Sequence, residues 1–237
     1  MESIISEREL REIIPGNAKL RMVEPHIYSL SDEGENTNAY DRMGAIYDVV
    51  ACSPLYNRLV WGYRTSAYHA LCQEALASSP EGWVLDAGCG SLAFTADTYA
   101  GFRSRPVVFL DQSVRLLVMA KSRLIRLTGE IPRNMAFLHA DALSLPFQSA
   151  CFSTILCLNV LHCLQDVREA LTQLKRVLNP GGAMFLTTLV RSNRLADRYL
   201  DTLGNAGALV PRTAEQVVAF FDERNIPVTC RVEGSLA

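Results

Sequence analysis

The sequence lacks the features that mark several classes of protein. No apolar run approaches the roughly 18–20 residues that cross a bilayer, so no transmembrane segment is expected. The first residues mix acids with bases and contain no apolar signal core. Charge of either sign is not in excess, since 23 basic residues face 25 acidic ones for a net charge of -2. Proteins that bind nucleic acid through phosphates carry a basic excess, so we expect no nucleic-acid partner.

The cysteines argue against disulfide bonds and against a metal site. The seven cysteines are an odd number and no C-x-x-C motif occurs. This pattern favours free thiols in a reducing compartment, and a cytoplasmic protein is therefore expected. No close pair of Cys or His residues is repeated at ligand spacing, so no metal site is predicted.

The chain divides into a leading part and a longer regular part. Its 237 residues are 49% hydrophobic, which suffices for one sizeable core. A polar segment at 29–38 separates the first residues from a stretch at 40–79 with helical spacing of apolar residues. We expect an N-terminal leader and helical cap over 1–80, followed by a ligand-binding α/β domain over 81–237. Residues 1–80 and 191–212 are expected to cover the binding edge.

Short apolar runs alternate with helical segments after residue 82. The runs are continuous rather than alternating, which is typical of parallel strands buried on both faces; they are 83–88, 107–111, 135–140, 153–159 and 183–190. Helices are expected at 113–127, at 166–178 and after Thr213. Capping residues precede the apolar periodicity of the second and third of these. The alternation predicts an α/β fold with a doubly wound, mostly parallel sheet. Residues 226–234 are expected to supply a sixth strand, and 235–237 only begin a seventh.

Polar or glycine residues follow the first three expected strands. Gly88 and Gly90 form a sharp turn after the first, because glycine allows positive φ and close approach of a ligand. Asp111 ends the second strand, 21 residues after Gly90, where a carboxylate accepts both hydroxyls of a ribose. Asp141 follows the third strand, where it can accept from an exocyclic amine while the Ala142 amide donates to a ring nitrogen. Because strand ends meet at one edge of such a sheet, these residues predict a nucleoside site.

Two classes of nucleoside-binding protein fit this layout. Gly88, Gly90 and Ala93 satisfy the G-x-G-x-x-A pattern of dinucleotide sites, so an NAD(P)-dependent oxidoreductase is one alternative. However, Asp86 stands two residues before the first glycine, where dinucleotide sites carry an apolar residue. An acid there suits a cationic or amine-bearing ligand better than a pyrophosphate.

The segments VLDAGCGS, VVFLDQS, FLHADALSLPF, STILCLNVLHCL and LKRVLNPGGAMFLTTLV together resemble the motifs of class I S-adenosylmethionine-dependent methyltransferases. YDRMGAIYDVV at 40–50 resembles the N-terminal helix of their ubiquinone/menaquinone-biosynthesis (type 11) branch. The resemblance implies S-adenosyl-L-methionine as cofactor and a small acceptor, for which we expect lipophilic or aromatic character. It implies cofactor contacts from Asp86, Gly88, Gly90, Asp111, Gln112, Asp141, Ala142 and Asn159.

The same resemblance places the chemistry after the fourth strand and in the cap. Leu161 and His162 would face the methyl group or the acceptor, and His162 is the candidate general base because its ordinary pKa suits that role. Tyr47, with Tyr40, is a candidate contact in the cap. Leu92 stands where the family usually has a third glycine, which would narrow the methionine pocket. This departure leaves a cofactor-binding protein without methyl-transfer activity as another alternative.

Overall fold

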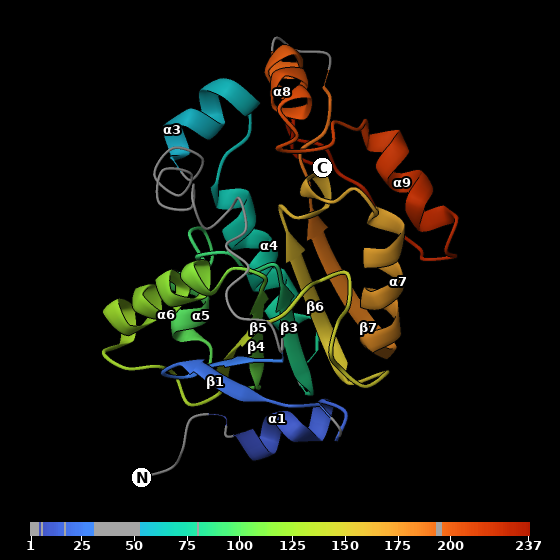
Figure 1. The fold of residues 1–237 in the computed structure, drawn as a ribbon. Coiled ribbons are helices and arrows are strands. Elements are labelled where there is room, and N and C mark those ends of the chain that lie inside the picture. The colour runs from blue at the N-terminus through green and yellow to red at the C-terminus, as the bar shows by residue number, and fades with distance from the viewer. Residues whose placement is uncertain (1–4, 6, 17, 31–52, 80, 193–195) are drawn as a thin grey trace.

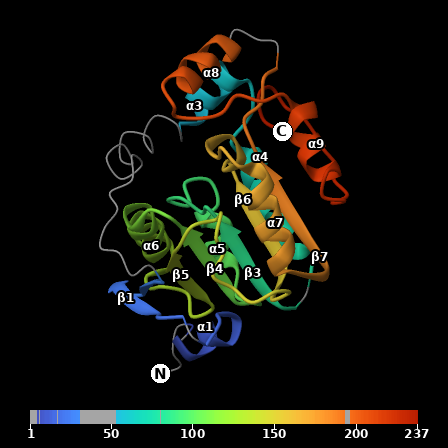
Figure 2. The same ribbon diagram turned by 45° about the vertical axis from the view of Figure 1, so that its right-hand side comes forward.

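The computed structural model describes residues 5, 7–16, 18–30, 53–79, 81–192 and 196–237. A seven-stranded sheet lies between two layers of helices (Figures 1 and 2). The strands are β1 (Arg21–Glu24), β2 (Ile27–Ser29), β3 (Trp83–Ala87), β4 (Val107–Asp111), β5 (Met135–His139), β6 (Phe152–Leu158) and β7 (Leu178–Thr187). Their order is β1-β2-β5-β4-β3-β6-β7, and all neighbours are parallel except β1 and β2. The predicted doubly wound sheet is confirmed.

The five strands expected from apolar runs are all present. The last begins at Leu178 rather than at 183, because Leu178 pairs with Phe152 before a register shift restores pairing between Thr154 and Ala183. Chain order reverses at β3, with β4 on one side of it and β6 on the other. Ligands of open α/β sheets bind at the carboxyl ends of strands at such a switch point.

Each face of the sheet is covered by its own helices. In β4, Val108 and Leu110 point to one core, while Val107 and Phe109 point to the other, as the two-residue period of a strand requires. The first core packs against α1 (Glu7–Ile13), α7 (Val167–Val177) and α9 (Ala214–Asp222). The second packs against α4 (Ser66–Ala77), α5 (Ala96–Gly101) and α6 (Val114–Thr128).

The predicted helices begin at hydrogen-bonding caps. The Ser113 hydroxyl accepts from the Leu116 N–H at the start of α6, and the Asp166 carboxylate accepts from the Glu169 N–H at the start of α7. Thr213 forms a capping box with Gln216 before α9. These caps satisfy N–H groups that the first helical turn leaves without partners.

A third apolar cluster lies beyond the carboxyl ends of the strands. It joins the α3 helix (Pro54–Tyr56), the π-helical turn η1 (Asn57–Trp61) and α8 (Ala196–Asn205), which lie at the end of the molecule opposite α1 (Figure 1). Trp61, Tyr63, Tyr68, Leu189 and Leu200 are buried in it. Residues 53–68 therefore meet residues 189–192 and 196–209 at the edge where the sequence predicts a cover.

The expectation that the whole leader joins this cover is wrong for residues 7–16 and 18–29. Strand β2 pairs in parallel with β5, and β1 adds to it as the outer strand. Leu10, Ile13 and Ile14 are buried in the first core, and the α1 helix lies far from the carboxyl ends of the strands (Figure 1). The leader extends the sheet because these apolar side chains gain more from core burial than from exposure.

The expected sixth strand at 226–234 is also absent from the structure. Residues 227–233 are exposed, and the chain instead contacts the end of β7 through single bridges. The Thr188 N–H donates to the Ala237 carbonyl at 2.9 Å, and the Val190 N–H donates to the Ser235 carbonyl at 2.8 Å. The two additional strands of the sheet come from the leader instead.

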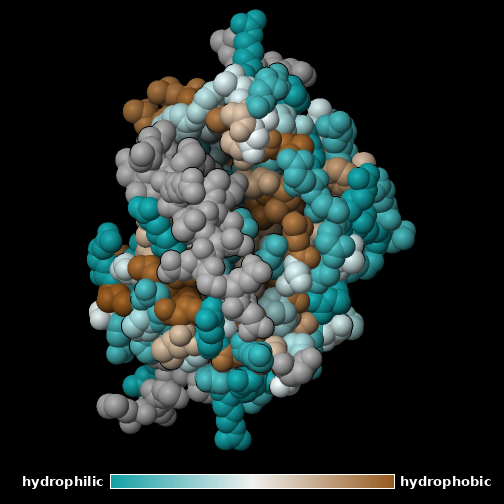
Figure 3. All heavy atoms as spheres, in the orientation of Figure 1, coloured by the Kyte–Doolittle hydropathy of each residue, from teal (hydrophilic) through white to brown (hydrophobic). Residues whose placement is uncertain are grey.

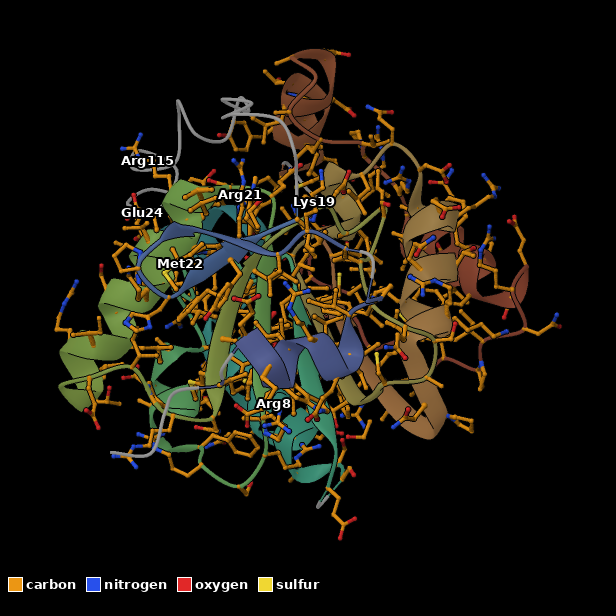
Figure 4. The ribbon with its side chains drawn as sticks, turned by 60° about the horizontal axis from the view of Figure 1, so that its bottom comes forward. Arg8, Lys19, Arg21, Met22, Glu24 and Arg115 are labelled. Atoms are coloured by element: carbon orange, nitrogen blue, oxygen red, sulfur yellow. The ribbon has the colours of Figure 1, made fainter. Side chains whose placement is uncertain are left out.

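The outer strand β1 carries exposed charges. Arg21, Met22 and Glu24 project from it, with Lys19 before it and Arg8 on the nearby α1 helix (Figure 4). A short, charged edge strand resists pairing with other chains. Among the described residues, no helix is both long and apolar enough to cross a membrane.

Packing of the leader against the sheet makes a testable prediction. Leu10→Ala should lower the free energy of unfolding by about 2–5 kcal/mol, because Leu10 is fully buried and its removal leaves a cavity. Met22→Ala is the matched control, since Met22 is 57% exposed on the same leader. Urea denaturation measures both. Equal midpoints for the two variants would show that the leader does not stabilise the domain.

Candidate functional site

A pocket of about 410 Å³ lies at the carboxyl ends of the central strands. Its walls come from the segments that follow β3, β4, β5 and β6, together with α4 and the start of α6. Apolar side chains gather in a hollow on this face of the molecule (Figure 3). The lining includes Asp86, Gly88, Gly90, Asp111, Gln112, Asp141, Ala142 and Asn159, so the structure brings all eight predicted cofactor residues together.

The glycine turn is tied to the neighbouring strand. The N–H groups of Gly88 and Cys89 both donate to the Leu110 carbonyl, at 2.7 and 3.0 Å. Gly88 has φ of 74°, and a Cβ added there would lie 2.5 Å from Cγ2 of Val160, so only glycine fits. A Cβ added at Gly90 would meet no atom within 4 Å, which leaves space beside the turn for a ligand.

Asp86 is a buried acid directly before this turn. Its position in β3 points its side chain to the same face as Val84, toward α4 and α5. The Tyr99 hydroxyl donates to Oδ2 of Asp86 at 2.8 Å. Burial raises the pKa of the Asp86 carboxyl to about 7, although the Tyr99 hydrogen bond opposes this and the Asp111 charge adds to it.

Asp111 holds the turn in place as well as lining the pocket. Its Oδ2 accepts from the Gly90 N–H at 2.8 Å, and its Oδ1 accepts from the Ser113 N–H at 2.9 Å. These two bonds fix both oxygens of the carboxylate at the pocket wall. Gln112 is exposed beside it on the pocket wall.

The segment after β5 turns sharply at the pocket. Oδ1 of Asp141 accepts from the Leu143 N–H at 2.8 Å, which is an Asx turn. The Asp141 side chain is exposed, and Ala142 and Leu143 line the pocket beside it. An acceptor oxygen and backbone groups therefore stand at this wall, as an adenine site requires.

Asn159 carries a polar atom without a partner. Its N–H donates to both the carbonyl and the hydroxyl of Thr187, at 2.9 and 3.0 Å, and its φ is 60°. Oδ1 of Asn159 is buried and has no hydrogen-bond partner among the described residues. Such an atom is costly unless a ligand or water donates to it.

The expectation that His162 shares this cleft with Asn159 is wrong. His162 lies in the 3₁₀ turn η2 (Leu161–Cys163), is 3% exposed, and is absent from the pocket wall, as is the buried Leu161. Nδ1 of His162 accepts from the Leu189 N–H at 3.2 Å. Burial, with the Arg212 charge, lowers its pKa to about 4, so it is a poor base at neutral pH. The side chain packs inward because the backbone of Leu189 supplies its partner.

Two other predicted residues receive no structural test. Tyr40 and Tyr47 fall outside the described residues. Leu92 does line the pocket, and its φ of 55° places it in the left-handed region that favours glycine. Its side chain is only 2% exposed and packs in the core with Ala96 and Tyr99. Core packing thus offsets the backbone strain at this position.

Sequence reasoning missed the aromatic part of the pocket wall. Tyr68 and Phe94 stack with centroids 4.6 Å apart and planes 13° apart, and both line the pocket. Cys163, Leu164 and Gln165 also line the pocket. Aromatic residues at 68 and 94 carry no motif, and only the fold brings α4 beside the loop after β3. The described part of the chain contains no cluster of His, Cys, Asp or Glu suited to a metal ion.

Residues 85–186 match a family model described as a methyltransferase domain. A 2-phytyl-1,4-naphtoquinone methyltransferase of Synechocystis is 37% identical over 105 residues, which are 44% of this chain and 43% of that protein. The chain spans about half the length or less of the curated relatives that it matches. These similarities do not favour the oxidoreductase alternative.

Solved structures share the fold at low sequence identity. The [4+2]-cyclase SpnF superposes with a TM-score of 0.60 at 22% identity, covering 78% of this chain and 69% of that one. Geranyl diphosphate C-methyltransferase of Streptomyces coelicolor, in complex with S-adenosyl-L-homocysteine, gives 0.53 at 15% identity, covering 67% and 56%. These neighbours establish the Rossmann-like class of the sheet.

The buried histidine predicts a pH dependence of stability. The folded-state pKa of His162 lies below the ordinary value, so the unfolded chain binds the proton more tightly and the free energy of unfolding decreases as the pH is lowered. Between pH 6.5 and 4 the wild type should lose about 3 kcal/mol more than His162→Gln. Denaturant unfolding at several pH values measures the difference. The same slope for the wild type and His162→Gln would contradict the assignment.

Proposed function

We propose that this protein, whose residues 85–186 form a class I methyltransferase domain, transfers the methyl group of S-adenosyl-L-methionine to a small lipophilic or aromatic acceptor. The proposal rests on one observation above all. The glycine turn after β3 and the acids after β4 and β5 converge on one pocket at the switch point of the sheet.

The described residues fit the proposed cofactor chemically. Open space beside Gly90 suits the methionine portion, and the unpartnered Oδ1 of Asn159 suits an ammonium donor. The Asp86 carboxyl stands in the same wall for the amino group. Asp111 and Gln112 would accept the ribose hydroxyls.

Adenine would lie against the Asx turn. Asp141 would accept from its exocyclic amine, and the Ala142 amide would donate to a ring nitrogen. Charge-assisted hydrogen bonds of this kind are about twice as strong as neutral ones, so the three acids supply much of the affinity.

The bound cofactor would supply an activated methyl group on a sulfonium. The remaining tasks of the protein are to orient the acceptor and exclude water, and orientation alone can supply about 7–11 kcal/mol. Because His162 is buried away from the pocket with a lowered pKa, we assign catalysis to positioning rather than to that base. Tyr47 stays a candidate contact of the acceptor.

The acceptor would occupy the apolar and aromatic part of the pocket wall. This part contains Tyr68, Phe94, Leu158, Val160, Cys163 and Leu164. The naphthoquinone in the name of one relative agrees with such a wall. Gln165 at its rim offers an amide that could orient an acceptor hydroxyl.

Partners and compartment follow from composition. The net charge of -2 favours a small-molecule partner over nucleic acid. The cysteines in the described part of the chain are free thiols, which agrees with a cytoplasmic protein. We keep the proposed division into a leader and cap over 1–80 and a cofactor domain over 81–237, with the leader strands extending the sheet of that domain.

Two experiments test the proposal, one of ligand binding and one of methyl transfer. Calorimetric titration with S-adenosyl-L-homocysteine should give saturable binding, whereas NADH should give none. Transfer of a labelled methyl group from S-adenosyl-L-methionine should then be measured over a panel of phenols, quinols and amines. Binding without transfer to any acceptor would favour the alternative of a cofactor-binding protein.

The proposed adenine contact of Asp141 can be tested by substitution. Asp141→Ala should weaken S-adenosyl-L-homocysteine binding about 10- to 100-fold, because a charged hydrogen-bond acceptor is lost. Asp141 is exposed, so the melting temperature should change little. Asp222→Ala, also exposed but on α9, is the control and should bind as the wild type does. Wild-type affinity in Asp141→Ala would remove this residue from the site.

The stacked pair of Tyr68 and Phe94 in the pocket wall makes a further prediction. Phe94→Ala should raise the KM of aromatic acceptors about tenfold, since aromatic stacking contributes about 0.5–1.5 kcal/mol beyond area burial. Phe94→Leu keeps apolar volume and should lose the preference for aromatic over aliphatic acceptors. Steady-state kinetics at saturating cofactor separate these effects. An unchanged KM in both variants would place the acceptor elsewhere.

A further inference from the structure

Asp86 and Tyr99 form a buried hydrogen-bonded pair at the base of the pocket. Oδ2 of Asp86 lies 2.8 Å from the Tyr99 hydroxyl, and the two residues are 2% and 0% exposed. Tyr99 belongs to α5, and its ring packs edge-on against Phe109 of β4. The hydroxyl is thus fixed by helix and sheet packing, and it has a defined direction toward the carboxylate.

The other groups that act on Asp86 come from four elements. Cys72 lies on α4, Cys89 in the glycine turn and Cys157 on β6, and burial raises the pKa of each thiol. These thiols are therefore neutral near pH 7. Asp111 at the end of β4 is the charged neighbour, and its repulsion favours the neutral form of Asp86.

The Tyr99 hydroxyl favours ionisation of Asp86, whereas burial and repulsion by Asp111 disfavour it. A hydroxyl donated to a carboxylate favours the charged form, because it replaces part of the lost hydration. The carboxylate that lines the pocket therefore depends on a residue that does not line it. Tyr99 holds one oxygen of Asp86 and leaves the other for a ligand.

We infer that Tyr99 is a positioning residue that keeps Asp86 oriented and ionised for the ammonium group of the cofactor, so that cofactor affinity is set by pH through this pair. The inference rests on the proposed function. It adds a regulatory property of the same site, since binding of the ammonium requires release of the Asp86 proton.

The consequence is a bell-shaped affinity profile for ligands that carry the amino group. Below neutral pH, protonation of Asp86 removes the attraction, and above about pH 8 the ligand amine loses its own proton. Loss of the Tyr99 hydroxyl should move the acid limb to higher pH by about one unit. Tyr99→Phe should then bind about fivefold more weakly at pH 7 and about tenfold more weakly at pH 6, because less Asp86 is ionised.

Two ligands distinguish a positioning role of Tyr99 from a purely structural role. S-adenosyl-L-homocysteine carries the amino group, whereas 5′-methylthioadenosine lacks it but keeps the adenosine. Calorimetric titrations of the wild type and Tyr99→Phe with both probes should run from pH 5.5 to 9. Tyr28→Phe on β2, away from the pocket, is the matched control. The Asp86 carboxyl titration is followed directly by carbon-13 NMR, with Asp86→Asn to assign the resonance.

Three results would support the inference together. The acid limb should move for S-adenosyl-L-homocysteine in Tyr99→Phe, the Asp86 titration should move with it, and 5′-methylthioadenosine should show neither limb. Asp86→Asn should lose the acid limb, and adding Tyr99→Phe to it should change nothing further.

Equal weakening of both probes at every pH would overturn the inference, because Tyr99 would then only support the fold. An unmoved limb in a folded Tyr99→Phe protein would overturn it as well. Failure of the wild type to bind S-adenosyl-L-homocysteine would instead refute the proposed function. If Tyr99→Phe does not fold, the acid limb of the wild type and its loss in Asp86→Asn decide whether the pair sets the pH dependence.

Discussion

The Asp111 carboxylate is the interaction on which the pocket depends. It joins the Gly90 N–H of the turn after β3 to the Ser113 N–H that precedes α6. A carboxylate that is only 7% exposed is costly unless its lone pairs are used, and these two donors use part of them. The same bonds bring the glycine turn against the end of β4, and Ser113 in turn caps α6. Turn, strand and helix thus form one wall around a charge that a ligand can still reach.

A second buried acid, Asp86, lies close enough to Asp111 for the two negative charges to repel each other. Two carboxylates flank the glycine turn, and each raises the cost of ionising the other. For Asp86 the raised pKa means that its contribution to stability is present at acid pH and is lost as pH rises toward 7. A cationic ligand would offset that loss, so the site is better matched to an amine-bearing molecule than to a pyrophosphate. This physical argument agrees with the sequence argument from the acid before the first glycine.

Local patterns predicted most of the central fold and one half of the site. Apolar runs marked β3 to β7, and the Asp166 and Thr213 caps marked the starts of two helices, because these signals act within a few residues. Gly88, Asp111 and Asp141 could be found since each directly follows a strand. The place of the leader cannot be predicted from local patterns, because β2 pairs with β5, more than a hundred residues away, and three residues cannot show a strand period. Tyr68 and Tyr99 were missed because burial beside a distant strand leaves no local mark.

The orientation of His162, the expected general base, is set by backbone contacts that the sequence does not reveal. Arg212 is 8% exposed, and its guanidinium donates to the carbonyls of Leu161 and Leu164, at 3.1 and 2.8 Å. The Val210 N–H donates to the His162 carbonyl at 2.7 Å. These bonds draw the carbonyls of the η2 segment toward residues 210–212 and set its path along the pocket. His162 then meets the Leu189 N–H, while Leu164 lines the wall. Any residue type supplies a carbonyl, so the sequence of this segment cannot reveal which of its side chains faces the ligand.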